Sequence, residues 1–257
     1  MPAYRYAQRP ARSGPVDYRA ELLAAVDELP PLPRVLDRVL QLLEDSNSSS
    51  AQIAAMIEKD AVLAGNVLRC VNSAYYGLQA TVTSIRHAVS MLGFATIRNQ
   101  ALAFSLRRMI GSTRTPPPRL YSRYSEHSLA CAMLAHDLAQ RVEADNAEAA
   151  FACGLFHDIG KLMILSTFPE LLGTIVERYE QGEGDYQAAE MEVLNLTHSQ
   201  VSRMVLEKWK LPQYMQEAVE HHHDPAGSPK PDRGPSLAAI VHAADLYVNA
   251  YGLTILA

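Results

Sequence analysis

The sequence has few cysteines and no pattern typical of β-strands. Its three cysteines stand singly and far apart inside apolar stretches, and no CxxC pair is present. They cannot all pair with one another, so Cys70, Cys131 and Cys153 are each interpreted as a small buried apolar side chain in a reducing compartment. Apolar and polar residues show no sustained alternation between turn signals, which argues against a β fold.

The sequence also lacks an excess of positive charge and a long apolar run. Its 23 lysines and arginines against 28 acidic residues give a net charge of −5, so nothing draws the chain generally to nucleic acid or to an anionic membrane. No apolar run reaches the ~20 residues that a membrane helix needs. The N-terminus has arginines but no apolar segment, so no signal peptide is visible. We expect a soluble, cytoplasmic protein with no membrane partner.

What is present is a helical pattern over almost the whole chain. With 257 residues, of which 48 % are hydrophobic and 20 % charged, the chain is long enough for two lobes with separate cores. Residues 1–16, rich in proline and arginine, predict a flexible tail. Helical spacing begins at Asp17, and the run from Thr115 to Pro118 interrupts it. We therefore expect an all-α, two-lobe helical bundle, with a small lobe over 17–112 packed on a larger lobe over 119–257.

Local signals mark several helix ends. Ser49 with Gln52 three residues later fits a capping box, and Gly93 is a suitable residue to end a helix. A long helix is predicted over 95–109. In the second half, the spacing of apolar residues predicts helices over 120–142, 147–158, 169–181, 185–194, 198–209, 212–222 and 235–249.

The most informative stretch is FACGLFHDIGKL, from Phe151 to Leu162. It places His157 and Asp158 directly after an apolar run and shortly before Lys161. Adjacent imidazole and carboxylate groups can ligate one divalent metal or bridge two, and the lysine could hold a phosphate oxygen. The pair belongs to a spaced series of such residues, which continues with His127, His198, His222, His223 and Asp245.

Six stretches together carry a resemblance to a known family. In the first half they are LPPLP (29–33), IEKDAVLAGNVLRCVNSAYYG (57–77) and SIRHAVSMLG (84–93); in the second half they are GLFHDIGKL, LTHSQVSRMVLEKWKLP and VEHHHDP. With these motifs the chain resembles the HDOD proteins, a bacterial signalling family related to the HD phosphohydrolases, from about residue 28 to 249. The resemblance implies an all-helical fold and a regulatory role in signal transduction.

The resemblance also implies a set of metal ligands. The basic HD pattern matches His127, His157, Asp158 and Asp245. Second-metal ligands, as in the HD-GYP branch, would be His198, His222 and His223. Such mixed sets suit Fe, Mn, Zn or Ni better than Ca, so one or two divalent ions are expected. Asp158 would bridge two ions that activate water for attack on phosphorus, while Lys161 neutralises phosphate charge.

Four other histidines are interpreted without a metal. His87 and His136 lie on predicted helices outside the series, as surface or hydrogen-bonded residues. On a helix, His221 would point about 100° away from its neighbour and need not join the ligands. For His242, packing is preferred to a supporting contact behind the ligands.

Three functions remain in competition. The first is a regulatory module that acts through signalling protein partners, since the first-lobe motifs contain no obvious chemistry. The second is a metal-dependent phosphohydrolase of a nucleotide or cyclic dinucleotide, although Asp224 to Pro229 lacks the Gly-Tyr-Pro signature of cyclic di-GMP phosphodiesterases. A site that only stabilises the fold is an alternative to a catalytic one, so enzyme activity stays open.

Direct DNA binding is the third function and is not expected. The segment from Ile53 to Val71 superficially resembles a helix-turn-helix. Its second helix offers only Asn66, Arg69 and Asn72 as polar contacts, and the acidic chain has no basic face.

Overall fold

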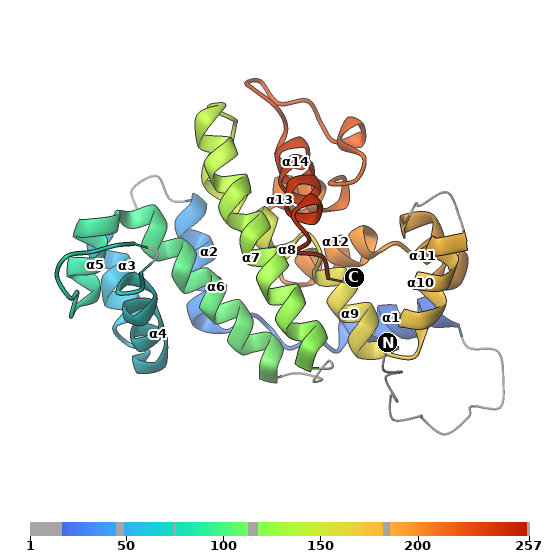
Figure 1. The fold of residues 1–257 in the computed structure, drawn as a ribbon, viewed down its shortest axis with the longest axis horizontal. Helices are drawn as coiled ribbons and strands as arrows, with labels where there is room; N and C mark the ends of the chain where they lie inside the picture. Colours follow the sequence, from blue (N-terminus) through green and yellow to red (C-terminus); the bar gives the residue numbers. More distant parts are fainter. Residues whose placement is uncertain (1–16, 45–48, 75, 113–117, 182–185, 256–257) are drawn as a thin grey trace. The chain divides into compact units, whose positions relative to one another are not determined.

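The computed structural model describes residues 17–44, 49–74, 76–112, 118–181 and 186–255. The tail predicted at 1–16 lies outside this range. Within the described residues all regular elements are helices, which confirms the all-α prediction (Figure 1). Contacts divide the chain into a small unit, Pro31–Thr113, and a large unit, formed by Met1–Pro30 with Arg114–Ala257.

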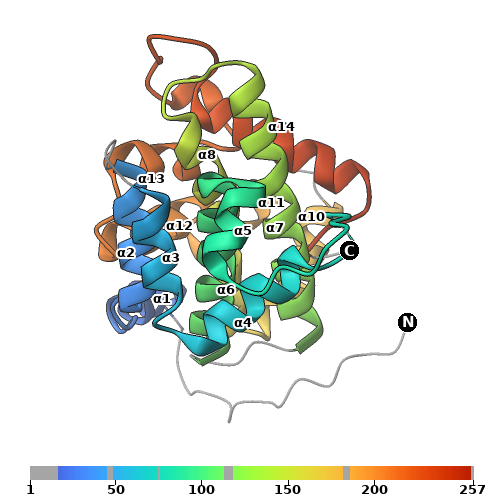
Figure 2. The same cartoon turned by 90° about the vertical axis from the view of Figure 1, so that its left-hand side faces the viewer.

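Among its described residues the small unit contains five helices, and α6 contacts each of the other four (Figure 2). They are α2 (Arg34–Glu44), α3 (Ser50–Ile57), α4 (Ala61–Val71), α5 (Ile85–Leu92) and α6 (Phe94–Ser112). The predicted capping box forms, since Ser49 and Gln52 exchange side-chain and backbone hydrogen bonds at the start of α3. Gly93 ends α5 with a φ of 82°, a left-handed conformation that favours glycine.

The side chain of Asn72 closes the end of α4 and holds the loop that follows. Its amide donates to the carbonyl oxygens of Leu68 and Val82, each at 2.8 Å, and its oxygen accepts from the Val82 backbone N–H at 2.7 Å. The polar atoms of Asn72 are therefore used inside the small unit. This removes one of the three side chains that a DNA-reading helix would have offered.

The large unit contains nine α-helices among the described residues. They are α1 (Tyr18–Asp27), α7 (Pro118–Arg141), α8 (Ala150–Phe156), α9 (Ile159–Thr167), α10 (Leu171–Gln181), α11 (Tyr186–Leu194), α12 (His198–Lys208), α13 (Gln213–Glu220) and α14 (Leu237–Ala250). Helices α7, α8 and α14 pack against one another, and α12 packs on α9 and α13. These two groups meet at the junction between α8 and α9, where His157 and Asp158 lie.

Helix α1 belongs to the large unit, whereas we expected residues 17–112 to form one lobe. It packs on α9 and α12, where Leu22 is buried and the ring of Tyr18 meets the ring of Phe168 edge-on at 5.1 Å between centroids. The indole N–H of Trp209 donates to the Pro30 carbonyl oxygen at 3.1 Å. An amphipathic pattern reveals that a helix has an apolar face but not which distant residues cover it.

Helix α9 was not predicted, because the helical pattern before it was expected to stop at 158 and the next to begin at 169. Most of α9 is buried, including Ile159, Leu162 and Ile164. A helix without a polar face shows no 3.6-residue period. In the part of the chain that the structure describes, Ala147–Thr167 is the one segment long and apolar enough to cross a membrane, and 83 % of its apolar window is buried inside the fold.

Candidate metal centre

Two glycines bring the helices of the site unusually close. A Cβ added to Gly154 on α8 would lie 2.8 Å from the Ala132 Cα on α7, and a Cβ on Gly160 in α9 would overlap the His198 backbone carbonyl. Real Cβ atoms do not approach backbone so closely, so both positions require glycine. The pair His157-Asp158, between these glycines, is thereby held against α7 and α12.

The first group of ligand atoms, here called the first cluster, surrounds one oxygen of Asp158. His127 Nε2 lies 3.3 Å from His157 Nε2 and 3.1 Å from Asp245 Oδ1. Asp158 Oδ2 lies 3.5 Å from His127 Nε2 and 3.4 Å from His157 Nε2. Ligands bonded to one ion at about 2.1 Å in a tetrahedron are about 3.4 Å apart. The spacing therefore fits one metal ion.

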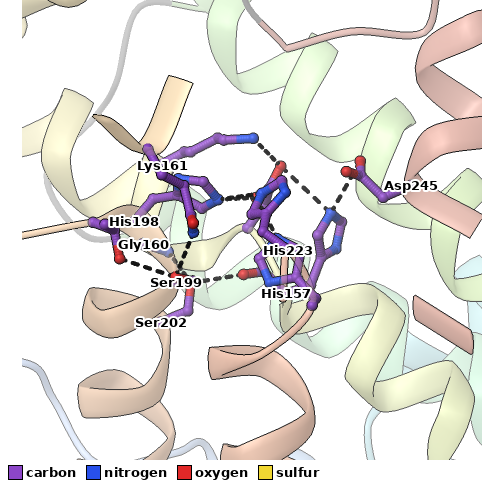
Figure 3. A network of polar contacts seen from close by, with 12 residues as sticks. His157, Gly160, Lys161, His198, Ser199, Ser202, His223 and Asp245 are labelled. Atoms are coloured by element: carbon purple, nitrogen blue, oxygen red, sulfur yellow. Dashed lines mark hydrogen bonds and ion pairs between the residues drawn. The ribbon is translucent and has the colours of Figure 1, made fainter. Parts of the chain in front are cut away.

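A second cluster surrounds the other oxygen of Asp158. His198 Nε2 lies 3.2 Å from Asp158 Oδ1 and 3.0 Å from His223 Nε2, and His222 Nε2 lies 3.7 Å from the same carboxylate oxygen. These four ligand atoms lie within 4.8 Å of one another. Figure 3 shows His198 and Asp245 approaching the network from opposite sides. The structure thus brings together all seven side chains of the predicted series.

The histidines are oriented as metal ligands are. In four of them the ring Nδ1 faces an oxygen that can only accept, at 2.6–2.8 Å. These pairs are His127 with the Leu253 carbonyl, His157 with the Gly154 carbonyl, His222 with the Val219 carbonyl, and His198 with a Glu190 carboxylate oxygen. Nδ1 therefore carries a hydrogen, and Nε2 can present its lone pair to the cluster.

Two buried atoms of the second cluster lack a hydrogen-bond partner. Asp158 Oδ1 and His222 Nε2 are both without one among the described residues, although both side chains are fully buried. Leaving such atoms unsatisfied costs about 1–3 kcal/mol each, and more for a charged group. Both atoms are electron-pair donors, so a cation between them would satisfy both. The residues present therefore fit a divalent metal ion.

In the first cluster, imidazole protons offset the buried carboxylate charge. Burial lowers the pKa of His127, but hydrogen bonds to Asp158 and Asp245 outweigh this effect and raise the pKa to about 12. Burial also lowers the pKa of His157, but the same two carboxylates outweigh this effect and raise the pKa to about 10. These protons occupy the Nε2 positions that would bind a metal ion. A proton on the imidazole and a metal ion each offset the negative charge of the same carboxylates.

The second cluster keeps its histidines neutral. Burial lowers the pKa of His222, and burial with the nearby His222 and Lys161 lowers the pKa of His223 to about 3. Burial and the Lys161 charge also hold the pKa of His198 well below its usual value. Neutral imidazole is the form that binds metal, so these three side chains are ready to ligate at neutral pH.

Lys161 pairs with the shared carboxylate. Its Nζ lies 2.8 Å from Asp158 Oδ2 and 5.6 Å from the centre of the Tyr186 ring. Burial would raise the pKa of Asp158, but the charges of Lys161 and His157 outweigh it and hold this pKa well below its usual value. The Lys161 side chain is 13 % exposed, so it lies at the rim of an otherwise buried group.

Two supporting residues were not found from the sequence. Glu190 accepts hydrogen bonds from both the backbone N–H and the ring of His198, at 2.8 and 2.6 Å. Ser202 accepts from the Gly160 N–H and donates to the His157 carbonyl, at 2.8 and 2.7 Å (Figure 3). Of these, Ser202 alone had a signal, since it lies four residues after His198 and thus on the same helical face.

His242 also supports the site rather than only packing. Its Nδ1 lies 2.7 Å from the carbonyl oxygen of His222, which ties α14 to the His222-His223 pair. His221 lies outside both clusters, next to Gly227 and Glu220. His87 is exposed on α5 and His136 lies on α7, and neither belongs to a cluster of the described residues.

Comparison with known proteins agrees with this architecture. An uncharacterized protein of Treponema pallidum is 23 % identical over 212 residues, which cover 82 % of this chain and 40 % of that relative. The chain therefore spans less than half of that protein's length.

Two of the solved structures that match illustrate the shared fold. An HDOD domain protein of unknown function from Geobacter sulfurreducens matches with a TM-score of 0.79 and 25 % identity, over 92 % of this chain and 78 % of its own. A protein of Shewanella amazonensis, named as a candidate phosphohydrolase, matches with a TM-score of 0.72 and 25 % identity, over 91 % of this chain and 82 % of its own. The family model described as HDOD domain matches residues 29–225. The chain therefore belongs to the HDOD domain family.

Proposed function

We propose that the large unit binds two divalent metal ions and that the chain is a metal-containing regulatory module of signal transduction. The observation that supports this most strongly is the position of Asp158, whose two oxygens face two separate clusters of imidazole nitrogens. A buried carboxylate with oriented imidazole nitrogens on both sides is the arrangement of a bridging ligand.

The ions would be held by two ligand sets that share one residue. The first set is His127, His157, Asp158 and Asp245, and the second is Asp158, His198, His222 and His223. Imidazole with carboxylate favours Fe, Mn, Zn or Ni over Ca. When bound, such ions supply Lewis-acid chemistry toward phosphate oxygens.

Regulation through a protein partner is the role proposed for the small unit. Among the described residues, both groups of potential metal ligands lie in the large unit. The polar residues of the small-unit motifs stabilise its own helices: Asp60 caps α4, Ser84 caps α5 and Asn72 holds a loop. A unit whose described polar motif residues stabilise its own helices is suited to recognising another protein through its shape.

A phosphohydrolase acting on a nucleotide or cyclic dinucleotide is the second candidate. Two observations favour it: both ligand sets are complete, and Lys161 and the half-buried His223 lie at the rim. There Lys161 would bind a phosphate oxygen of the substrate and offset its charge. Its ammonium group lies against the shared carboxylate, where it would bring that phosphate next to both clusters.

Metal content tests the metal site that both candidates share. Protein purified without a chelating column should contain two metal equivalents by elemental analysis, and Asp158→Ala should retain less than one. The matched control is His87→Ala, which changes an exposed histidine outside both clusters. Two equivalents in a folded Asp158→Ala variant would show that the site assignment is wrong.

Hydrolysis decides between the regulatory and the enzymatic candidate. Metal-loaded protein should be assayed with bis(p-nitrophenyl) phosphate and with cyclic dinucleotides. Turnover that disappears in Asp158→Ala and persists in His87→Ala would establish the phosphohydrolase. Two bound metals without turnover of any of these substrates would favour the regulatory module.

A further inference from the structure

Cys131 lies among the ligand atoms of the first cluster. It follows His127 by four residues on α7, so both side chains leave the same face of the helix. Its Sγ lies 3.6 Å from His127 Nε2, and Sγ, His127 Nε2, His157 Nε2 and Asp245 Oδ1 are all within 4.8 Å of one another. From the sequence, Cys131 was interpreted as a small buried apolar side chain; the structure gives it polar neighbours.

The packing of α7 on α8 sets this position. A Cβ on Gly154 would lie 2.9 Å from the Cys131 carbonyl oxygen, so the backbones of α7 and α8 are in contact at Cys131. Cys153, also fully buried, lies on α8 and belongs to neither group of potential ligands. The two cysteines share burial and differ in what surrounds them, which makes Cys153 a matched comparison.

A hydrogen bond to His127 does not explain this contact once a metal is bound. The Nδ1 of His127 already donates to the Leu253 carbonyl, so Nε2 is its only free position, and a metal ion would take the lone pair there. The thiol would then face a buried divalent cation, next to which thiols lose their proton and ligate. With a Cys131 thiolate, the anionic ligands would be Cys131, Asp158 and Asp245. Their combined charge is smaller than the positive charge of two divalent ions and Lys161.

We propose that Cys131 is a thiolate ligand of the metal ion in the first cluster and that it makes this cluster selective for zinc, iron(II) or cobalt(II) over manganese and magnesium. The inference rests on the proposed function, since it requires a metal in that cluster. Ligation forms a metal–Sγ bond, breaks the S–H bond and releases the proton to the buffer, with no change of oxidation state. Sulfur is a soft ligand, whereas manganese and magnesium favour oxygen.

Cobalt(II) reports sulfur ligation directly. The full chain loaded with cobalt should show a sulfur-to-cobalt charge-transfer band in the near ultraviolet. Cys131→Ala should lose the band and still bind two cobalt ions at saturation, while Cys153→Ala should keep both. The zinc affinity of the first cluster should fall at least about tenfold in Cys131→Ala, as for lost supporting contacts, and its manganese affinity should change less.

Other results of the cobalt experiment would refute either the ligation by Cys131 or the metal site as a whole. Two bound cobalt ions without a sulfur band, or a band that survives in Cys131→Ala, would refute ligation by Cys131 and leave the metal site standing. No bound cobalt would refute both this inference and the proposed function. If Cys131→Ala does not fold, Cys131→Ser keeps a similar volume and should lose the band while it retains cobalt.

Discussion

Replacing Gly160 with alanine should separate the two clusters. The added Cβ would overlap the His198 carbonyl and lie 2.8 Å from the backbone nitrogen of Ser202. Carbon makes favourable contacts at about 3.5–4.0 Å, so α9 and α12 must move apart by roughly 0.7 Å or more. The neighbouring atoms belong to the backbone of a buried helix and cannot rotate away. Asp158 and His198 must therefore separate.

Such a displacement is large for a metal site and modest for the fold. Ligand distances tolerate about 0.2 Å, while Asp158 Oδ1 and His198 Nε2 now lie 3.2 Å apart. The second cluster should lose its ion, and the first, which α12 does not contribute to, should keep one. Overpacking typically costs about 1–3 kcal/mol, which corresponds to a fall in Tm of roughly 2–12 °C for a unit of this size.

Elemental analysis and thermal unfolding followed by circular dichroism test this reasoning. We expect one metal equivalent in Gly160→Ala against two in the wild type. The control is Gly65→Ala on α4, where an added Cβ meets nothing within 4 Å; it should keep both ions and should stabilise the helix by about 0.5–1 kcal/mol. Two equivalents and an unchanged Tm in Gly160→Ala would refute the role of glycine at this contact.

Three further predictions concern other parts of the large unit. Glu190→Gln should weaken metal binding by the second cluster about 10–100-fold in chelator competition, because His198 loses its charged acceptor; the exposed change Glu180→Gln should have no effect. Lys161→Met should leave metal content unchanged and weaken binding of inorganic phosphate at least about tenfold by calorimetry, since a charged hydrogen bond contributes about 1.5–3 kcal/mol; unaltered phosphate affinity would rule out the assigned role. Burial raises the pKa of Cys153 to about 12 from an ordinary value of 9.0, so the unfolded chain loses this proton first and stability should fall by up to about 1.4 kcal/mol per pH unit above about pH 9. The denaturant midpoint should decline less with pH in Cys153→Ala than in the wild type. An equal decline in both proteins would contradict the raised pKa assigned to Cys153.

Features that depend on neighbouring residues were predictable from the sequence. The capping box at Ser49 and the helix end at Gly93 involve atoms only a few residues apart. Most helices of the large unit followed from apolar spacing, because an amphipathic helix carries its burial pattern within its own residues. The seven members of the ligand series could be named because the chain has only 9 histidines and its motifs resemble a known family.

The sequence by itself therefore determined the all-α class and singled out the seven imidazole and carboxylate side chains that lie together in the large unit. Only the tertiary structure decided which oxygen of Asp158 faces which cluster, that Cys131 joins the first cluster, and that α1 packs with the large unit. The first two of these outcomes depend on how closely α7 and α12 approach α8 and α9, at Gly154 and Gly160. Contacts between helices far apart in the chain leave no period in the sequence, because each helix is compatible with many partners until its neighbours are packed.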